Sequence, residues 1–199
     1  MKKQKRDIRK KINSKLAKLS INRINQATQE INKFLQTKIE IKHGLRILSF
    51  DPMLQKNEIN LNPINDHIIL NKNHQLLLPR INPITDQIDC HLITYQGNQD
   101  WHDQLILNSY GIREPDPTIH PLVDPKSIDM IFVPGVAFSY HHLSKCFVRL
   151  GRGKGYYDNL LARIRSDCLT VGVGFLEQYY DQEIPIESHD RFIKQMYLF

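Results

Sequence analysis

The stretch IDMIFVP, residues 128–134, decides the fold, because its centre from Met130 to Val133 is continuously apolar. Such a run is typical of a central strand that is covered on both faces of a sheet. A second apolar run, LTVGVGF at 169–175, also reads as a strand, and the segment YYDNLLARI between the two runs is typical of the start of a helix. A strand, a helix and a strand in this order predict a βαβ unit and a largely parallel sheet.

The pattern continues toward the N-terminus. Three more short apolar runs lie between turn residues and predict strands: LRILSF at 45–50, QLLLPR at 75–80 and CHLITY at 90–95. Further upstream, apolar residues recur every three or four positions in two segments, which predicts two amphipathic helices. The recurring residues are Ile8, Ile12, Leu16 and Leu19 in the first segment, and Ile24, Ala27, Ile31, Phe34 and Leu35 in the second. Ser20 is expected to cap the second helix.

The predicted fold class is therefore α/β: three layers, with a largely parallel central sheet flanked by helices and two amphipathic helices at the N-terminus. Between Gly111 and Lys126, four prolines predict an extended surface connection that leads into the 128–134 strand. A length of 199 residues, 41% of them hydrophobic, suits one compact core. We therefore expect a single domain over residues 1–199.

The distribution of charge, the cysteines and the length of the apolar runs limit which classes of protein the sequence can belong to. Residues 1–18 hold nine Lys or Arg against one Asp, a net +8, so the total of +6 leaves −2 for the rest of the chain. Cys90, Cys146 and Cys168 are odd in number and far apart, which argues against a disulfide framework or a zinc site and favours a reducing cytoplasm. The longest apolar stretch is far shorter than the ~20 residues that cross a bilayer.

The segment RLGRGKGYYD, residues 149–158, carries the strongest functional signal. Gly151, Gly153 and Gly155 alternate with cations, so the backbone can turn closely around a ligand that the cations surround. Asp158 follows in the helix opening, a place that attracts anions, and its carboxylate would suit a nucleotide-borne magnesium ion. The spacing is neither that of a P-loop nor that of the dinucleotide fingerprint, so it predicts a third kind of polyphosphate loop. A solvated glycine turn and a grip on nucleic acid backbone are the alternatives.

Five motifs in chain order resemble those of the 5-formyltetrahydrofolate cyclo-ligase family, also called methenyltetrahydrofolate synthetases. They are GIREP at 111–115, VPGVAF at 133–138, RLGRGKGYYD at 149–158, GVGFLEQ at 172–178 and IPIESHD at 184–190. The basic KRDIR at 5–9 and NEIN at 57–60 resemble two further family segments. The resemblance thus covers nearly the whole chain.

The resemblance implies an enzyme that uses ATP and Mg²⁺ to close 5-formyltetrahydrofolate into 5,10-methenyltetrahydrofolate, with release of ADP and phosphate. It also implies a cytoplasmic monomer whose partners are the folate and ATP, with neither nucleic acid nor membrane. A folate- and nucleotide-binding descendant with weakened catalysis, and a basic nucleic acid-binding module, remain the alternatives.

Matched to the family motifs, the glycine segment and the N-terminal helix are expected to bind ATP. The ATP-binding residues would be Lys5, Arg6, Arg9, Arg149, Leu150, Gly151, Arg152, Gly153, Lys154, Gly155, Tyr156 and Tyr157. Arg149, Arg152, Lys154 and Tyr156 are the expected catalytic residues, because fixed cations neutralise charge on the transferring phosphoryl group. Lys5 and Arg9 are four apart and share one helix face.

The resemblance also implies substrate and metal sites. The substrate-binding residues would be Phe50, Glu58, Arg152, Gly153, Lys154, Gly155 and Tyr156. The Glu58 carboxylate suits two N–H groups of a pterin edge, whereas a strand Phe such as Phe50 is more often part of the core. Asp158 and Asp190 match the family's magnesium ligands, and carboxylate oxygens are what that ion prefers.

The chain departs from the family pattern beside this expected site. Phe138 is followed by Ser139 where the family usually has Asp, and ten residues separate Phe138 from Arg149 where the family has about five. Two interpretations stay open: a longer loop over the substrate in which Ser139 has a structural role, or weakened handling of magnesium or substrate.

Overall fold

The computed structural model describes residues 1–71, 73–95, 100–108 and 111–199. Its α-helices are α1 (Lys2–Leu16), α2 (Ile21–Glu40), α3 (Asn62–Leu70) and α4 (Tyr156–Leu161). Its strands are β1 (Arg46–Leu48), β2 (Gln75–Ile81), β3 (Ile88–Leu92), β4 (Leu105–Leu107), β5 (Arg113–Pro115), β6 (Leu122–Val123), β7 (Met130–Val133), β8 (Ala137–His141), β9 (Cys146–Leu150), β10 (Leu169–Gly174), β11 (Phe192–Ile193) and β12 (Gln195–Leu198). Short 3-10 helices lie at Leu54–Lys56, Trp101–Gln104, Pro125–Ser127 and Leu176–Gln178.

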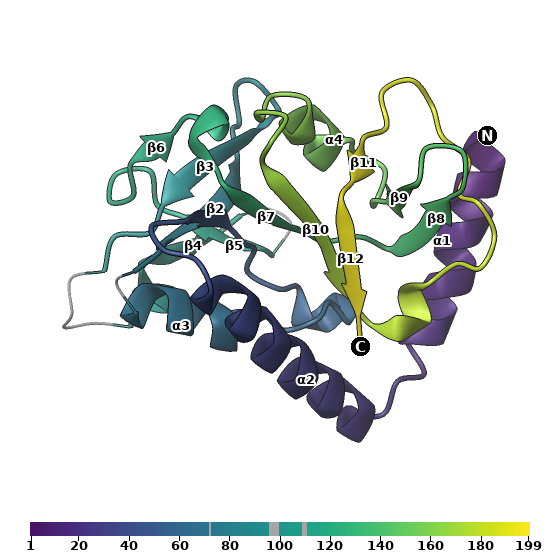
Figure 1. The fold of residues 1–199 in the computed structure, drawn as a ribbon, viewed down its shortest axis with the longest axis horizontal. Coiled ribbons are helices and arrows are strands. Elements are labelled where there is room, and N and C mark those ends of the chain that lie inside the picture. Colours follow the sequence, from purple (N-terminus) through teal and green to yellow (C-terminus); the bar gives the residue numbers. More distant parts are fainter. Residues whose placement is uncertain (72, 96–99, 109–110) are drawn as a thin grey trace.

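The central sheet has seven strands in the order β12-β10-β7-β1-β2-β3-β6 (Figure 1). The pairings from β12 to β2 are all parallel, whereas β3 and β6 continue the sheet in antiparallel pairing. Strand β7, whose four residues are all buried, lies inside the sheet between β10 and β1. The predicted α/β class with a largely parallel sheet is confirmed.

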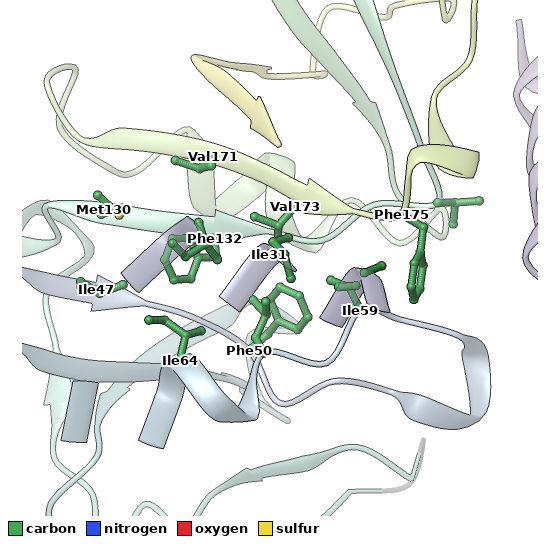
Figure 2. Close-up of a cluster of buried hydrophobic side chains, with 14 of the residues drawn as sticks. Ile31, Ile47, Phe50, Ile59, Ile64, Met130, Phe132, Val171, Val173 and Phe175 are labelled. Carbon is green, nitrogen blue, oxygen red and sulfur yellow. The ribbon is translucent and has the colours of Figure 1, made fainter. Parts of the chain in front are cut away.

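Helices cover both faces of this sheet. On one face, Ile31 of α2 and Ile64 of α3 pack in a buried cluster with Phe132 of β7, which Figure 2 shows together with Val171 and Val173 of β10. On the other face, Leu160 and Leu161 of α4 join a second cluster with apolar residues of β1, β2 and β7. These two clusters give the three layers that the sequence predicts.

The two N-terminal helices form as the periodicity predicts. Helix α1 lies at the edge of the molecule beside β8 and the 3-10 turn Leu176–Gln178, away from α2 and α3 (Figure 1). Its apolar residues Ile8, Ile12 and Leu16 are buried, and the helix ends at Leu16. Ser20 caps α2, since its hydroxyl oxygen accepts a hydrogen bond of 3.2 Å from the backbone N–H of Arg23.

A second, antiparallel sheet of β8, β9 and β11 was not predicted by the sequence patterns. Residues 137–150 form a β-hairpin, so the extra residues after Phe138 extend two paired strands. Ser139 is fully buried in β8, and its hydroxyl oxygen accepts a hydrogen bond of 3.1 Å from the backbone N–H of Ile184. Of the two interpretations, a structural role for Ser139 is the one that this contact supports.

Two further features complete the fold. The proline-rich connection from Gly111 to Lys126 contains β5, β6 and the start of a 3-10 turn, so it is more ordered than the single extended segment predicted. No helix in the described ranges has both the length and the apolar character needed to cross a membrane.

Candidate functional site

A cavity of about 800 Å³ opens where the parallel strands end. Phe50 and Asp51 follow β1, and Pro134 and Gly135 follow β7; these pairs line the cavity together with Ile81 at the end of β2. The edge formed by the carboxyl ends of parallel strands is where open α/β sheets bind ligands. The segment 149–158 and residues of α1 also line the cavity.

The glycine loop, residues 151–155, connects β9 to α4. Gly153 has φ 108° and Gly155 has φ 74°, both in the region that favours glycine, and Gly155 begins α4 as its N-cap residue. At Gly151 a Cβ atom would lie 2.6 Å from Nη1 of Arg149, so a side chain there would collide with that guanidinium. The alternation of glycines thus has a steric reason at each position.

Arg149 is buried next to the loop. Its Nη2 donates to Oδ2 of Asp158 at 2.9 Å, and the two side chains are 4% and 14% exposed. The guanidinium also lies 5.3 Å from the ring centre of Tyr157. Its Nε–H has no hydrogen-bond partner among the described residues, although Arg149 lines the cavity. A buried donor left unpaired in this way points to an acceptor that a ligand would supply.

The other two cations of the segment are more accessible. Arg152 donates through Nη2 to Oε1 of Glu58 at 2.9 Å, and Oε2 of Glu58 accepts from the backbone N–H of Met53 at 3.0 Å. Lys154 is exposed, lines the cavity and has no ion-pair partner within the described part of the chain. Lys154 is therefore the cation of the loop whose charge is least compensated by the protein.

Helix α1 reaches the same cavity from the other end of the chain. Arg9 donates through Nε to the carbonyl oxygen of Gly151 at 2.8 Å, and its guanidinium carbon lies 3.6 Å from the position of a Cβ on Gly153. Burial lowers the pKa of Arg9. Lys5, on the same helix face, also lines the cavity, whereas the side chain of Arg6 is 76% exposed and outside the lining set. The structure brings Arg9 to the glycine loop and Lys5 to the cavity, whereas Arg6 is at neither.

Lys5 joins α1 to the segment IPIESHD. Its ammonium lies 2.9 Å from Glu187 and 2.5 Å from Asp190. Burial lowers the pKa of Lys5, but the hydrogen bonds to Asp190 and Glu187 outweigh burial, so the net shift is upward. Burial raises the pKa of Asp190, yet the bonds from Lys5 and from the Glu187 backbone N–H turn the net shift downward. The hydrogen bond from Lys5 likewise lowers the pKa of Glu187.

The two expected metal ligands differ in their surroundings. Glu187, His189 and Asp190 each offer a ligand atom, and these atoms lie within 4.8 Å of one another. Asp158 is not in this group, but its Oδ1 accepts from the backbone N–H of Arg191 at 3.3 Å, so it lies beside Asp190 in space. The carboxylates of Glu187 and Asp190 are the hard oxygen donors that Mg²⁺ prefers. The donor set therefore fits such an ion.

The aromatic residues expected at the site have distinct positions. Tyr156 lines the cavity and donates through its hydroxyl to Oδ1 of Asp86 at 2.8 Å. Tyr157 lies against Arg149, and burial, with Glu58 nearby, raises the pKa of its phenol. Phe50 is 4% exposed and packs in the core, as Figure 2 shows, while also bordering the cavity. Leu150 is buried at the start of the loop and lines the cavity as well.

Several cavity residues were not assigned from the sequence. Arg113 binds Asp51 through Nε and Nη2 at 2.9 and 2.8 Å, and the Asp51 side chain is only 5% exposed. Next to it, buried Glu114 accepts from the backbone N–H of Ile81 at 3.1 Å. The motif GIREP contained both Arg113 and Glu114, and Asp51 directly follows the first predicted strand. The motif and the position after the strand could have identified these three residues as site candidates, but neither indicates what the residues do.

Known proteins resemble this chain over nearly its whole length. The model of the 5-formyltetrahydrofolate cyclo-ligase family matches residues 1–198. A probable 5-formyltetrahydrofolate cyclo-ligase of Schizosaccharomyces pombe is 27% identical and aligns with 94% of this chain and 91% of its own length.

Two solved structures have the same fold. The NMR structure of the Aquifex aeolicus 5,10-methenyltetrahydrofolate synthetase has a TM-score of 0.75 at 28% identity, over 95% of this chain and 86% of that one. The Mycoplasma pneumoniae 5,10-methenyltetrahydrofolate synthetase, at 21% identity, matches in fold with a TM-score of 0.70 over 96% of both chains. From the family match over residues 1–198, the chain belongs to the 5-formyltetrahydrofolate cyclo-ligase family.

Proposed function

We propose that the whole chain acts as one domain that cyclises 5-formyltetrahydrofolate to 5,10-methenyltetrahydrofolate, with ATP converted to ADP and phosphate. The observation that carries the proposal is the hydrogen bond from Arg9 to the carbonyl oxygen of Gly151. It joins the basic N-terminal helix to the glycine loop, so that cations from residues 142 positions apart line one cavity.

In this proposal the glycine loop and its cations bind the nucleotide phosphates. Gly153 and Gly155 turn the backbone so that its N–H groups can lie close to phosphate oxygens at the start of α4. Lys154 and Arg152 supply accessible charge, while buried Arg149 offers its unpaired Nε–H. Lys5 and Arg9 add charge from α1. Such preorganised cations stabilise the charge that develops on a transferring phosphoryl group.

The chemistry needs two steps. First, the formyl oxygen attacks the γ-phosphorus, the bond from that phosphorus to the β,γ-bridging oxygen breaks, and ADP leaves. Next, the neighbouring folate nitrogen attacks the formyl carbon and gives up its proton, and the carbon–oxygen bond breaks to release phosphate. Phosphorylation is required because a formamide oxygen is a poor leaving group. The protein's part is mainly to place the two substrates and to offset charge.

Glu58 is the proposed contact for the pterin. Glu58 lines the cavity, and hydrogen bonds from the backbone N–H of Met53 and from Arg152 hold its carboxylate in place. Each oxygen still has a lone pair that can accept from a ligand N–H. Phe50 and Ile81 give the apolar walls against which a ring system can pack. Arg152 would thus contact both substrates, because it reaches from the glycine loop to Glu58.

Magnesium would be held by carboxylates of the segment 187–190, with Asp158 next to it. A bound Mg²⁺ offsets charge on the phosphates. Lys5 offsets part of the negative charge of Glu187 and Asp190. We also propose that the protein is a cytoplasmic monomer that binds neither nucleic acid nor membrane.

The test is the absorbance of the methenyl-folate band in a mixture of purified protein, 5-formyltetrahydrofolate, ATP and Mg²⁺, with each component omitted in turn. We expect a rise only when all components are present, and one ADP released per folate cyclised. Folate binding without a rise would instead support a binding-only descendant. Affinity for nucleic acid that falls steeply with salt would support the nucleic acid alternative.

A further inference from the structure

The turn between β2 and β3 reaches the start of α4 at the cavity. Tyr156, the first residue of α4, donates its hydroxyl to Oδ1 of Asp86 at 2.8 Å, and these residues are 70 positions apart in the chain. Ile81 and Ile88, where the turn begins and ends, line the cavity with Tyr156. No motif identified in the sequence includes this turn, yet it contacts a residue of the glycine segment directly.

The turn is fixed by its own hydrogen bonds. The side-chain oxygen of Asn82 accepts from the backbone N–H groups of Ile84 and Thr85, at 2.8 and 3.1 Å. The side-chain nitrogen of Asn82 donates to Asp89 at 2.8 Å. Asp86 has φ 51°, a left-handed conformation that Asp tolerates better than most residues, and its N–H donates to the carbonyl oxygen of Asn82 at 3.0 Å. Asp86 is thus placed by the turn, independently of Tyr156.

The contact with Asp86 determines the hydrogen-bonding role of the Tyr156 hydroxyl toward a ligand. A phenol has one proton, and Tyr156 donates it to Asp86, so the oxygen meets any ligand as a hydrogen-bond acceptor. The ring packs against the second buried cluster, and the bond to a carboxylate fixes where its hydroxyl lies. A ligand group that faces Tyr156 must therefore carry an N–H or O–H.

We propose that Asp86 is a positioning residue, which holds Tyr156 at the cavity wall as an acceptor for an N–H or O–H of the folate. The proposal rests on the proposed cyclo-ligase function. It assigns the turn between β2 and β3 a role in turnover rather than in folding.

The experiment is a double-mutant cycle of Asp86→Gly and Tyr156→Phe, measured as kcat and KM for 5-formyltetrahydrofolate. Glycine removes the acceptor and suits the positive φ, so the turn should keep its shape. We expect Asp86→Gly to lower kcat/KM about tenfold and to have almost no effect once Tyr156 is Phe. Asp86→Asn, which keeps a neutral acceptor, should recover part of the loss. Thr85→Ala, in the same exposed turn, is the matched control and should behave as the wild type.

The outcomes separate the two proposals. If wild-type protein shows no turnover, the cyclo-ligase function fails and the role of Asp86 fails with it. If the wild type is active, an Asp86→Gly loss that persists in full in the Tyr156→Phe background overturns the positioning role alone, as does an unchanged rate in Asp86→Gly. If Asp86→Gly melts at a much lower temperature than the wild type, the double-mutant cycle is repeated with Asp86→Asn and Tyr156→Phe. An effect of Asp86→Asn that persists in full in the Tyr156→Phe background then overturns the positioning role.

Discussion

Arg149 and Asp158 connect the two ends of the glycine segment by an ion pair of 2.9 Å between largely buried side chains. Arg149 is the next-to-last residue of strand β9 and Asp158 lies in the first turn of α4, so the ion pair links the strand and the helix that the glycine loop connects. The loop is therefore held in shape by the same arginine that is proposed to contact phosphate.

Arg149→Ala should consequently lose both activity and stability. Removing one partner of a buried pair leaves an uncompensated charge, and we expect a loss of about 3 kcal/mol in the free energy of unfolding. Urea unfolding of Arg149→Ala, Asp158→Ala and the double variant measures this. The double variant should be less destabilised than the sum of the single variants; strict additivity would mean that the pair does not hold the loop.

Lys154→Ala should separate activity from stability. Lys154 is exposed and has no ion-pair partner in the described ranges, so its loss should change the free energy of unfolding by less than about 0.5 kcal/mol. If it contacts the transferring phosphoryl group, kcat/KM should fall about 100-fold. The methenyl absorbance assay and thermal melting measure the two effects. Lys126→Ala, an exposed lysine outside the cavity, is the control, and equal rates for the two variants would remove Lys154 from the site.

Ser139→Ala should affect stability and leave turnover unchanged. The variant leaves the N–H of Ile184 without its buried acceptor, which costs about 1–2 kcal/mol. None of residues 139–148 lines the cavity, so kcat should stay within about twofold of the wild type. Ser144→Ala, in the exposed hairpin turn, is the matched control. A large drop in kcat for Ser139→Ala without a change in melting temperature would instead indicate that the departure from the family pattern lies in the catalytic machinery.

The parallel part of the sheet was predictable because each of its inner strands is an apolar run between turn residues. Strand β7 is the clearest case, since its four consecutive apolar residues form a run of strand length rather than helix length, with Pro134 directly after it. Strands β8 and β9 form a local hairpin, but polar and charged residues within and between them, such as Ser139 and Arg149, interrupt the apolar pattern that predicts a strand. Strand β11 has only two residues and pairs with β9 from a distant segment. Pairing of this kind depends on tertiary contacts that local patterns do not contain.

Sequence motifs were enough to select the glycine segment and Glu58 as candidate site residues. They did not predict which side chains of the site form ion pairs and hydrogen bonds with each other. Lys5 was expected to face a ligand, but the structure pairs it with Glu187 and Asp190, which are more than 180 positions away. The same holds for Asp51 with Arg113 and for Asp86 with Tyr156. Motifs identify the residues with chemical groups, and long-range packing decides which of these groups compensate each other.

The ion pairs of Lys5 with Glu187 and Asp190, called the Lys5 cluster, should make the free energy of unfolding depend on pH in both acid and alkali. Asp190 and Glu187 have pKa values lowered from 3.8 and 4.5, so their contribution is fully present above about pH 4.5 and is lost as pH falls through the lowered values. Lys5 has a pKa raised from 10.5, so its contribution is present below that pH and is lost as pH rises above it. Lys5→Met removes the ammonium and should flatten both limbs, with a loss of about 2 kcal/mol on the plateau between them. Urea unfolding from pH 3 to pH 11 measures the profile, with Lys10→Met, on the exposed face of α1, as the control. A profile for Lys5→Met that runs parallel to the wild type at both ends would show that the cluster does not link α1 to the segment 187–190.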